Sequence, residues 1–365
     1  MTAVLLKELS NSDIDWMLET GQCREIEAGD VLMHPRQPIT ALHLLLDGAM
    51  SVSIQQPNDN PLGRAFAALE GGSISGREIA RLNSGEMIGE LPFVETYLPS
   101  TTVTALQRST ILSIPQSQLA QKLQQDIPFA AHLYRACAVL LANRLEQIIQ
   151  QVGQTTLVLS RPQLREILFI FAELHDSDID WMVTVGQVMQ VPAGNVLMQA
   201  GRPVDALHIV LSGRVALVSA EGDRNPLARA FSHLEKAEVI EQELAQLSRG
   251  DIVGESPFIE AQPPAVTVRA LEDSCVLTIP RWRLAAKLLH DTRFAARFYR
   301  VLSVLLADKQ QALVSRLGYG RLTYSTGQRL DEAMNYENEL SPSFLEQVSL
   351  AGARFDWMLK QVRVK

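Results

Sequence analysis

Ser12-Asp13-Ile14-Asp15-Trp16-Met17 occurs a second time in this chain, as Ser177-Asp178-Ile179-Asp180-Trp181-Met182. Ser12 and Ser177 are 165 positions apart, and every later match keeps that offset. The later matches are Ala41-Leu42-His43 with Ala206-Leu207-His208, Arg64-Ala65-Phe66 with Arg229-Ala230-Phe231, and Gly89-Glu90 with Gly254-Glu255. An offset that stays constant through turns and apolar runs alike indicates that one domain was duplicated whole.

Each repeat is predicted to open with a short helix. In the first repeat Ser12 is the expected N-cap, with Asp15 as the acidic partner of a capping box. Gly21 is expected to end this helix. The matching residues of the second repeat predict the same helix there.

The rest of each repeat is predicted to consist of short strands followed by two helices. Apolar runs of strand length lie between turn residues in the first repeat at 31–33, 41–46, 50–54, 101–106 and 109–114. A polar excursion, residues 55–81, interrupts them. A helix is expected over 116–126, and Pro128 is expected near the start of a longer one. Apolar residues recur at helical spacing from Leu133 to Ile148 and from Phe298 to Leu313. The pattern predicts an α+β domain around a β-barrel.

Three glycine-containing motifs carry a resemblance to a known family. They are Ala28-Gly29-Asp30-Val31-Leu32; Leu45-Leu46-Asp47-Gly48 with Val210-Leu211-Ser212-Gly213; and the segment from Gly85 to Leu91 with that from Gly250 to Glu255. Together they resemble the cyclic-nucleotide-binding domain, the sensor module of catabolite-activator regulators, cyclic-nucleotide-gated channels and cyclic-nucleotide-dependent kinases. The resemblance covers about residues 8–150 and 172–315. It implies two tandem double-stranded β-helix (jelly-roll-like) barrels, each flanked by N-terminal and C-terminal helices, with a C-terminal helical tail behind them.

The resemblance also implies where a ligand would bind. In that family a phosphate-binding cassette starts with Gly-Glu, continues through a short helix and reaches an arginine that pairs with the phosphate. Ten residues after Gly89 this chain has Pro99, and ten after Gly254 it has Pro264. Both repeats therefore lack the arginine, so ordinary binding of cyclic AMP or GMP is not expected.

The candidate ligand-binding residues are those that remain in the two cassettes. They are Gly89, Glu90, Ser100, Thr101, Thr102, Gly254, Glu255 and Thr267. The first repeat offers three successive hydroxyls where the second has Ala265, Val266 and Thr267, so the first is the better candidate to keep a ligand. The alternative is that Gly-Glu only forms a turn and that the threonines only form a strand. Arg64 and Arg229 are possible alternative anion contacts, or surface residues of a copied loop.

Matched histidines and apolar helix faces have structural alternatives too. His43 and His208 each lie on an apolar run, which favours a core or barrel-edge position over a ligand or a base. The two long apolar helix faces could pack on each other as an intrachain pseudo-dimer, or each could cover its own barrel. We find no spacing typical of a catalytic triad, a carboxylate pair or a metal site, and we expect no cofactor, no metal and no enzymatic activity.

The composition limits which partners and which location we expect for this protein. The net charge is −8 for 365 residues, and duplex DNA usually needs a basic face. Helix-turn-helix transcription factors are therefore not favoured, and no nucleic acid is expected as a partner. Three scattered cysteines without a CxxC motif predict reduced thiols. With no signal peptide and no stretch long enough to span a membrane, the expected location is the cytoplasm.

The end of the chain predicts one more helix. Behind an acidic stretch at 331–339, Ser341 is the expected N-cap and Pro342 the first helical residue. Phe344, Val348, Ala351, Phe355 and Leu359 then form one apolar face, which must be covered by the second domain or by another subunit.

These observations predict domain 1 at 1–153, a linker at 154–171, domain 2 at 172–317 and the tail at 318–365. The favoured function is a non-enzymatic regulatory or assembly protein that binds a protein partner or itself. The alternative is a sensor of a non-canonical nucleotide or small anionic ligand that transmits binding to a protein partner.

Overall fold

The computed structural model describes residues 3–35, 37–54, 77–89, 101–152, 170–220, 241–255, 258, 264, 266–316 and 342–363. Contacts divide the chain into two compact units, one formed by residues 1–155 and 295–335 and the other by 156–294 and 336–365. The last long helix of the second repeat therefore belongs mostly to the first unit. The predicted domain boundaries follow the repeat rather than these contacts, and they stay predictions.

The first repeat contains helices and strands in the predicted order. They are α1 (Ala3–Glu8), α2 (Asn11–Thr20), β1 (Gln22–Ile26), β2 (Val31–Met33), β3 (Ala41–Asp47), β4 (Ala49–Ile54), β5 (Arg77–Asn83), β6 (Met87–Ile88), β7 (Thr102–Ala105), β8 (Ser109–Pro115), α4 (Gln116–Gln125) and α5 (Ile127–Val152). The expectation that 55–81 is only a polar excursion is wrong at its end, because β5 starts at Arg77 and pairs with β4. Alternating side chains such as Ile79 and Leu82 are buried there.

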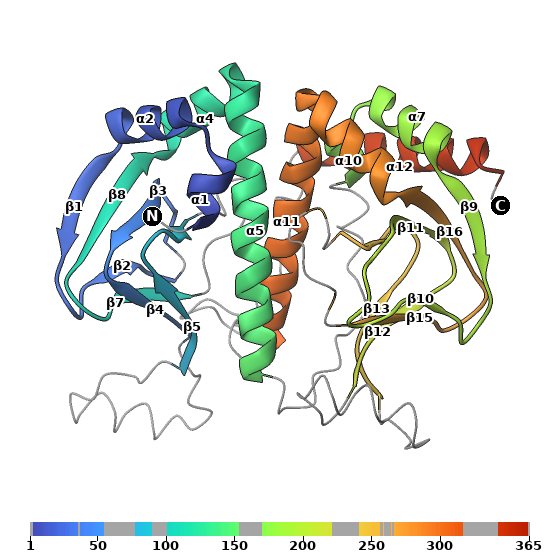
Figure 1. The fold of residues 1–365 in the computed structure, drawn as a ribbon, viewed down its shortest axis with the longest axis horizontal. Coiled ribbons are helices and arrows are strands. Elements are labelled where there is room, and N and C mark those ends of the chain that lie inside the picture. The colour runs from blue at the N-terminus through green and yellow to red at the C-terminus, as the bar shows by residue number, and fades with distance from the viewer. Residues whose placement is uncertain are drawn as a thin grey trace, which may run out of the picture. The chain divides into compact units, whose positions relative to one another are not determined.

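The second repeat follows the same plan (Figure 1). Its elements are α7 (Asp176–Val185), β9 (Gln187–Val191), β10 (Val196–Met198), β11 (Ala206–Ser212), β12 (Val215–Ala220), β13 (Glu241–Leu247), β14 (Ile252–Val253), β15 (Thr267–Ala270), β16 (Ser274–Pro280), α10 (Arg281–His290) and α11 (Thr292–Arg316). Helix α12 (Pro342–Gln361) follows and begins at the predicted proline.

Each barrel consists of two four-stranded antiparallel sheets. The orders are β1-β8-β3-β6 and β2-β7-β4-β5 in the first repeat, and β14-β11-β16-β9 and β10-β15-β12-β13 in the second. In the second barrel Val210 and Val276 from one sheet and Val215 and Val268 from the other belong to one buried cluster. The two sheets therefore pack face to face, and the α+β fold with tandem jelly-roll-like barrels is confirmed.

The opening helix begins two residues earlier than predicted. Ser10, not Ser12, is the N-cap of α2, and Asp13, not Asp15, completes the capping box. The Asp13 carboxylate accepts a hydrogen bond from the Ser10 N–H at 2.8 Å and lies 2.8 Å from Nδ1 of His132 on α5. Correspondingly, α7 begins after His175 with Asp178 in the capping position, rather than after Ser177 with Asp180. Gly21 and Gly186 end the two helices as predicted.

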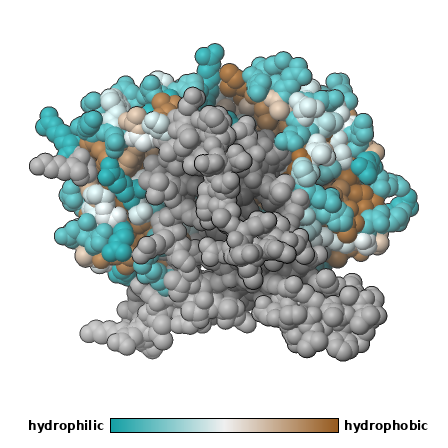
Figure 2. Space-filling model, turned by 180° about the vertical axis from the view of Figure 1, so that it is seen from behind, coloured by the Kyte–Doolittle hydropathy of each residue, from teal (hydrophilic) through white to brown (hydrophobic). Residues whose placement is uncertain are grey.

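Apolar residues of the helices cover one sheet of the first barrel. Leu133, Ala136, Cys137 and Leu140 of α5 are buried in the same cluster as Leu42 of β3. This face of α5 thus covers its own barrel, which was one of the two sequence alternatives. On the side of the molecule in Figure 2 the described residues are mainly hydrophilic, with apolar side chains in separate patches.

Helix α12 packs on the second domain. The ring of Phe355 meets that of Phe171 edge-on, with centroids 5.0 Å apart, and both side chains are buried. Arg354 donates to the Asp176 carboxylate at 2.7 Å and to the Phe171 carbonyl at 2.9 Å. Trp357 is 38 % exposed, and the side chains of Phe344 and Val348 lie outside the described residues. We expected the apolar face of the tail helix to pack on the second domain or on another subunit. In the structure it packs on the second domain.

Replacing Phe355 should therefore release the tail. Phe355→Ala removes a buried ring and should lower the free energy of unfolding of the unit that contains α12 by about 3–5 kcal/mol. Leu350 on the same helix is 44 % exposed, so Leu350→Ala is the matched control and should cost less than about 1 kcal/mol. Thermal and urea unfolding of both variants measure the difference, and equal stability of the two would contradict the docking.

Candidate functional site

Each cassette begins at a glycine that the backbone requires. Strand β6 pairs with β3 and ends at Gly89, which has φ +83°. A β-carbon at Gly89 would lie 2.8 Å from the Ala41 carbonyl oxygen. Gly254 has φ +89°, and a β-carbon there would collide with the Ala206 carbonyl oxygen. The fold thus needs both glycines whether or not a ligand binds.

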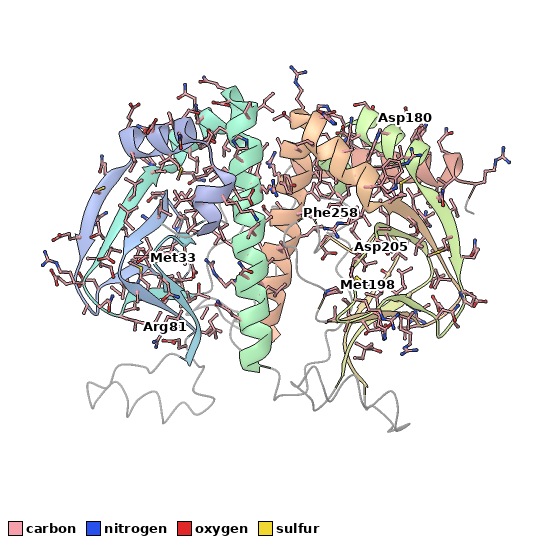
Figure 3. The ribbon with its side chains drawn as sticks, in the orientation of Figure 1. Met33, Arg81, Asp180, Met198, Asp205 and Phe258 are labelled. Carbon is pink, nitrogen blue, oxygen red and sulfur yellow. The ribbon has the colours of Figure 1, made fainter. Side chains whose placement is uncertain are left out.

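The second cassette has a buried proline ten residues after Gly254. After Gly254 the chain makes a turn in which the Phe258 N–H donates to the Glu255 carbonyl at 3.0 Å. Phe258 is buried (Figure 3). Pro264 is also buried, and its carbonyl accepts a hydrogen bond from the Gly201 N–H at 2.9 Å. The side chain at this position is apolar and supplies no donor to an anion.

Thr267 serves the backbone in the second repeat. Its hydroxyl accepts a hydrogen bond from the Ala200 N–H at 3.1 Å. The matching pair in the first repeat is Thr102 and Pro35. Since proline has no N–H, this bond cannot form there. The two repeats therefore differ at the hydroxyl that the sequence singled out in both.

The first cassette is described only at its two ends. Gly89 lies at the start, and Thr101 and Thr102 lie at the return, where Thr102 begins β7 and pairs with Ser53. The other candidates of the first cassette, and both alternative anion contacts, lie outside the described residues: Glu90, Pro99, Ser100, Arg64 and Arg229.

Helices α5 and α11 touch within the first unit. Ser303 is 3 % exposed, and its hydroxyl donates to the Tyr134 carbonyl of α5 at 2.9 Å. The guanidinium of Arg135 lies 5.7 Å from the centre of the Tyr299 ring and pairs with Glu8 at 3.0 Å. Burial raises the pKa of Tyr299, so its hydroxyl stays neutral. The contact uses residues beside the Leu133–Leu140 face, because that face is occupied by the barrel.

Arg144 connects α5 to the start of the first cassette. It is 8 % exposed, and its Nη2 donates to the Met87 carbonyl at 2.9 Å, two residues before Gly89. Sequence reasoning missed this residue. A charged residue inside the apolar face between Leu141 and Leu145 was the available signal, because buried arginines are kept where they have a specific partner. Through this hydrogen bond Arg144 connects the strand before the first cassette to α5, the helix that contacts α11.

Comparison with known proteins agrees with this geometry. A sequence profile described as "Cyclic nucleotide-binding domain" matches residues 23–126 and again 188–291, together more than half of the chain. The chain belongs to this family. Two domains of the cyclic-nucleotide-binding family in tandem suggest a regulatory or sensor role.

Curated relatives share one or both domains as part of longer proteins. An uncharacterized NTE family protein of Mycobacterium tuberculosis is 30% identical over 132 residues, which are 36% of this chain and 18% of that protein. Human patatin-like phospholipase domain-containing protein 6 is 25% identical over 197 residues, which are 54% of this chain and 13% of that protein. The chain thus spans less than a fifth of the length of these relatives.

Solved structures to which this chain is similar include a kinase regulatory subunit and a catabolite activator protein. One is the regulatory subunit of a cAMP-independent protein kinase A from Trypanosoma brucei, 15% identical, with a TM-score of 0.30 over 86% of this chain and 90% of that one. Another is the catabolite activator protein of Thermus thermophilus, 17% identical, with a TM-score of 0.32 over 52% and 76%.

Both cyclic-nucleotide-binding domains have a histidine at the matched strand position; His208 is buried, whereas His43 is partly buried. His43 Nδ1 lies 2.9 Å from the Ser113 hydroxyl, and His208 Nδ1 lies 3.0 Å from the Thr278 hydroxyl. The pKa of each histidine is lowered to about 4, at His208 by burial and at His43 by burial together with the charge of Arg24. Each histidine is neutral at pH 7 and serves the core. The described residues include no group of three or more His, Cys, Asp or Glu placed to hold a metal ion.

The histidines should make the fold sensitive to mild acid. Between pH 6.5 and 4 an unfolded histidine takes up a proton and the folded one does not, so stability falls as the pH falls through this window. For His208 the loss is at most about 3 kcal/mol. Urea unfolding measured from pH 7 to pH 4 gives the free energy of unfolding at each pH. This free energy should depend less steeply on pH in the double variant His43→Asn/His208→Asn than in the wild type.

Thr278→Ala tests whether burial of His208, rather than its contact with the Thr278 hydroxyl, lowers its pKa. It removes the hydroxyl but leaves His208 buried, so the pH slope should persist although overall stability drops. If the free energy of unfolding of the histidine double variant depends on pH as steeply as that of the wild type, the two histidines are not the cause of the acid sensitivity.

Proposed function

We propose that this chain is a non-enzymatic regulatory module whose two cyclic-nucleotide-binding domains act on a protein partner without binding cyclic AMP or GMP at ordinary affinity. The observation that carries the proposal is Pro264, which is buried and tied to Gly201 at the position of the family's phosphate-binding arginine. Pro99 stands at the same position of the first cassette.

The contact between the phosphate and the arginine contributes enough free energy that its absence would prevent ordinary binding of cyclic AMP or GMP. A hydrogen bond to a charged group contributes about 1.5–3 kcal/mol, and loss of the positive charge leaves the phosphate without its counter-ion. This corresponds to roughly ten- to a few-hundredfold in affinity for each site. Binding in the micromolar range would thereby move toward millimolar.

A role as a module for other proteins is supported by the relatives. Proteins named for an NTE family, a patatin-like phospholipase and a potassium channel match this chain over only 13–26% of their own lengths. Their names include a phospholipase and a potassium channel, and each matches this chain over a small part of its own length. We infer that the region supplies regulation or assembly rather than the chemistry of any one of them.

A route for transmission is supported by the contacts of α5. Arg144 holds the strand that leads into the first cassette, and Tyr134 and Arg135 on the same helix contact α11. A change at Gly89 would pull on Met87 and thus on α5. In this proposal the helix pair presents the state of the cassette to the partner.

The compartment follows from the cysteines. None of the three cysteines, Cys23, Cys137 and Cys275, is in a disulfide, and the last two are buried. We propose a reducing location, the cytoplasm, for these domains. None of the described helices is long and apolar enough to cross a membrane.

Cyclic AMP should leave the stability unchanged. At roughly tens of micromolar we expect no shift of the melting temperature, because a ligand far below its dissociation constant adds almost nothing to stability. Differential scanning fluorimetry with cyclic AMP and cyclic GMP measures this, and a saturating shift would refute the proposal.

Restoring the arginine is the complementary experiment. Pro99→Arg should recover part of the affinity, because Gly89 and Glu90 are already present. Pro264→Arg should recover less, because the hydroxyl of Thr267 is already engaged by Ala200. A positive shift with Pro99→Arg alone shows that the rest of the cassette is intact.

A second function is favoured by one observation at Thr102. Its partner position in the first repeat is Pro35, so the bond that engages Thr267 is impossible there. Thr102, with Thr101, Ser100 and Glu90, would then hold a non-canonical nucleotide or small anion, and Arg64, which has a match in Arg229, is the candidate anion contact. In this case the first domain is the sensor and the second is structural.

This alternative predicts an asymmetry between two threonines. In a thermal-shift screen of cyclic mononucleotides and dinucleotides, any stabilising compound should lose its effect in Thr102→Ala and keep it in Thr267→Ala. A screen in which no compound stabilises the wild type rejects this second function and leaves the first.

A further inference from the structure

Helices α4 and α10 are copies of one helix that have diverged on one side only. Their inner sides agree: Leu119 and Leu284 are fully buried, and Lys122 and Lys287 pair with Asp126 and Asp291 at 2.8 and 2.7 Å. The outer side of α4 is polar and uncharged. At the matching positions of the first and second repeat stand Gln116 and Arg281, Ser117 and Trp282, Gln118 and Arg283, Gln124 and Leu289, and Gln125 and His290.

The new apolar residues of α10 point into solvent. Trp282 is 67 % exposed and Leu289 is 77 % exposed. They are seven residues apart, which is two helical turns, so they lie on one side of the helix. Ala285 and Ala286 between them are also exposed. Figure 1 shows α10 on the outside of the strands of the second barrel.

Only positive charge accompanies these residues on α10. The helix contains Arg281, Arg283, Lys287 and His290 and no acidic residue. The Arg283 guanidinium lies 4.8 Å from the centre of the Trp282 ring, so cation and ring form one exposed unit. Arg293, just beyond the helix, is exposed as well. The next acidic residue, Asp291, is engaged by Lys287. At the N-terminal end the Arg281 N–H donates to the backbone carbonyl of Asp205.

We infer that this outer side of α10, formed by Trp282, Arg283, Leu289 and His290, docks on an anionic lipid surface. Tryptophan and leucine that protrude from a helix beside arginines are the composition of an interfacial helix. Tryptophan favours the headgroup level of a bilayer, and basic residues are attracted by anionic lipids.

A lipid surface fits better than the other partners with the same charge. A free phosphate or nucleotide would use the arginines and leave Trp282 and Leu289 in water. An acidic protein would have to supply a hollow for two side chains that project from a convex helix, whereas a bilayer accepts them as they stand. The inference is independent of the proposed function, since it involves neither cassette.

The repeat itself supplies the test variants. Trp282→Ser/Leu289→Gln and Arg281→Gln/Arg283→Gln place on α10 the residues that α4 already carries, so both variants should fold. The full chain is sedimented with vesicles of phosphatidylcholine, alone or mixed with about one-third phosphatidylserine. Circular dichroism and melting curves check that the variants are folded.

We expect the wild type to bind the mixed vesicles and to bind phosphatidylcholine at least tenfold more weakly. Either double substitution should reduce binding to the mixed vesicles at least tenfold, and 0.5 M salt should weaken the wild type. The reciprocal variant, with Gln116→Arg, Ser117→Trp, Gln118→Arg and Gln124→Leu, should bind more tightly than the wild type because it carries two such helices.

Three results would overturn the inference. One is absence of binding to both kinds of vesicle. Another is binding that both folded α10 double variants retain in full. The third is capture of the wild type by an immobilised acidic amphipathic peptide without any binding to vesicles, which would assign the surface to a protein partner instead.

Discussion

The backbone crosses itself at Gly89 so closely that no β-carbon fits between this residue and the Ala41 carbonyl, and Gly254 makes the same crossing over Ala206. This approach ends the two-residue strands β6 and β14 and sends the chain into the cassette. It also places Met87 where Arg144 can reach its carbonyl. The crossing depends on a positive φ and on the absence of a side chain, not on a ligand. The backbone at the start of each cassette is therefore set by the glycine and does not depend on which residue follows ten positions later.

The duplication separates what the fold needs from what each copy does. Residues that face the barrels agree between the repeats, as with Trp16 against Phe129 at 5.0 Å and Trp181 against Phe294 at 5.5 Å. Outward positions differ. Leu6 is 57 % exposed, whereas Phe171, its match, is buried by α12. The second repeat thus has α12 packed on Phe171 and an apolar and basic outer side on α10. In the first repeat Thr102 cannot form the bond that Thr267 forms with Ala200, because the matching residue is Pro35.

The capping residues show where local sequence reasoning reached its limit. Ser10-x-x-Asp13 and Ser12-x-x-Asp15 satisfy the same capping-box pattern, and they overlap by two positions. Asp13 is selected because its carboxylate also contacts His132, which is 119 residues away in the chain. Similarly, β5 was hidden in a polar segment because pairing with β4, rather than its own composition, makes it a strand.

The sequence by itself determined the repeat and its offset, most of the strands, the start of the tail helix at Pro342 and the prolines that stand ten residues after the two cassette glycines. These features depend only on local composition and on the spacing of residues along the chain. Only the tertiary structure decided that the Leu133–Leu140 face covers its own barrel, that Tyr134 and Ser303 join α5 to α11, and that α12 packs on Phe171. Helical periodicity shows which side of a helix is apolar and must be buried. It carries no information about which of several apolar surfaces will bury it, because that depends on shape and on hydrogen-bond partners distant in sequence.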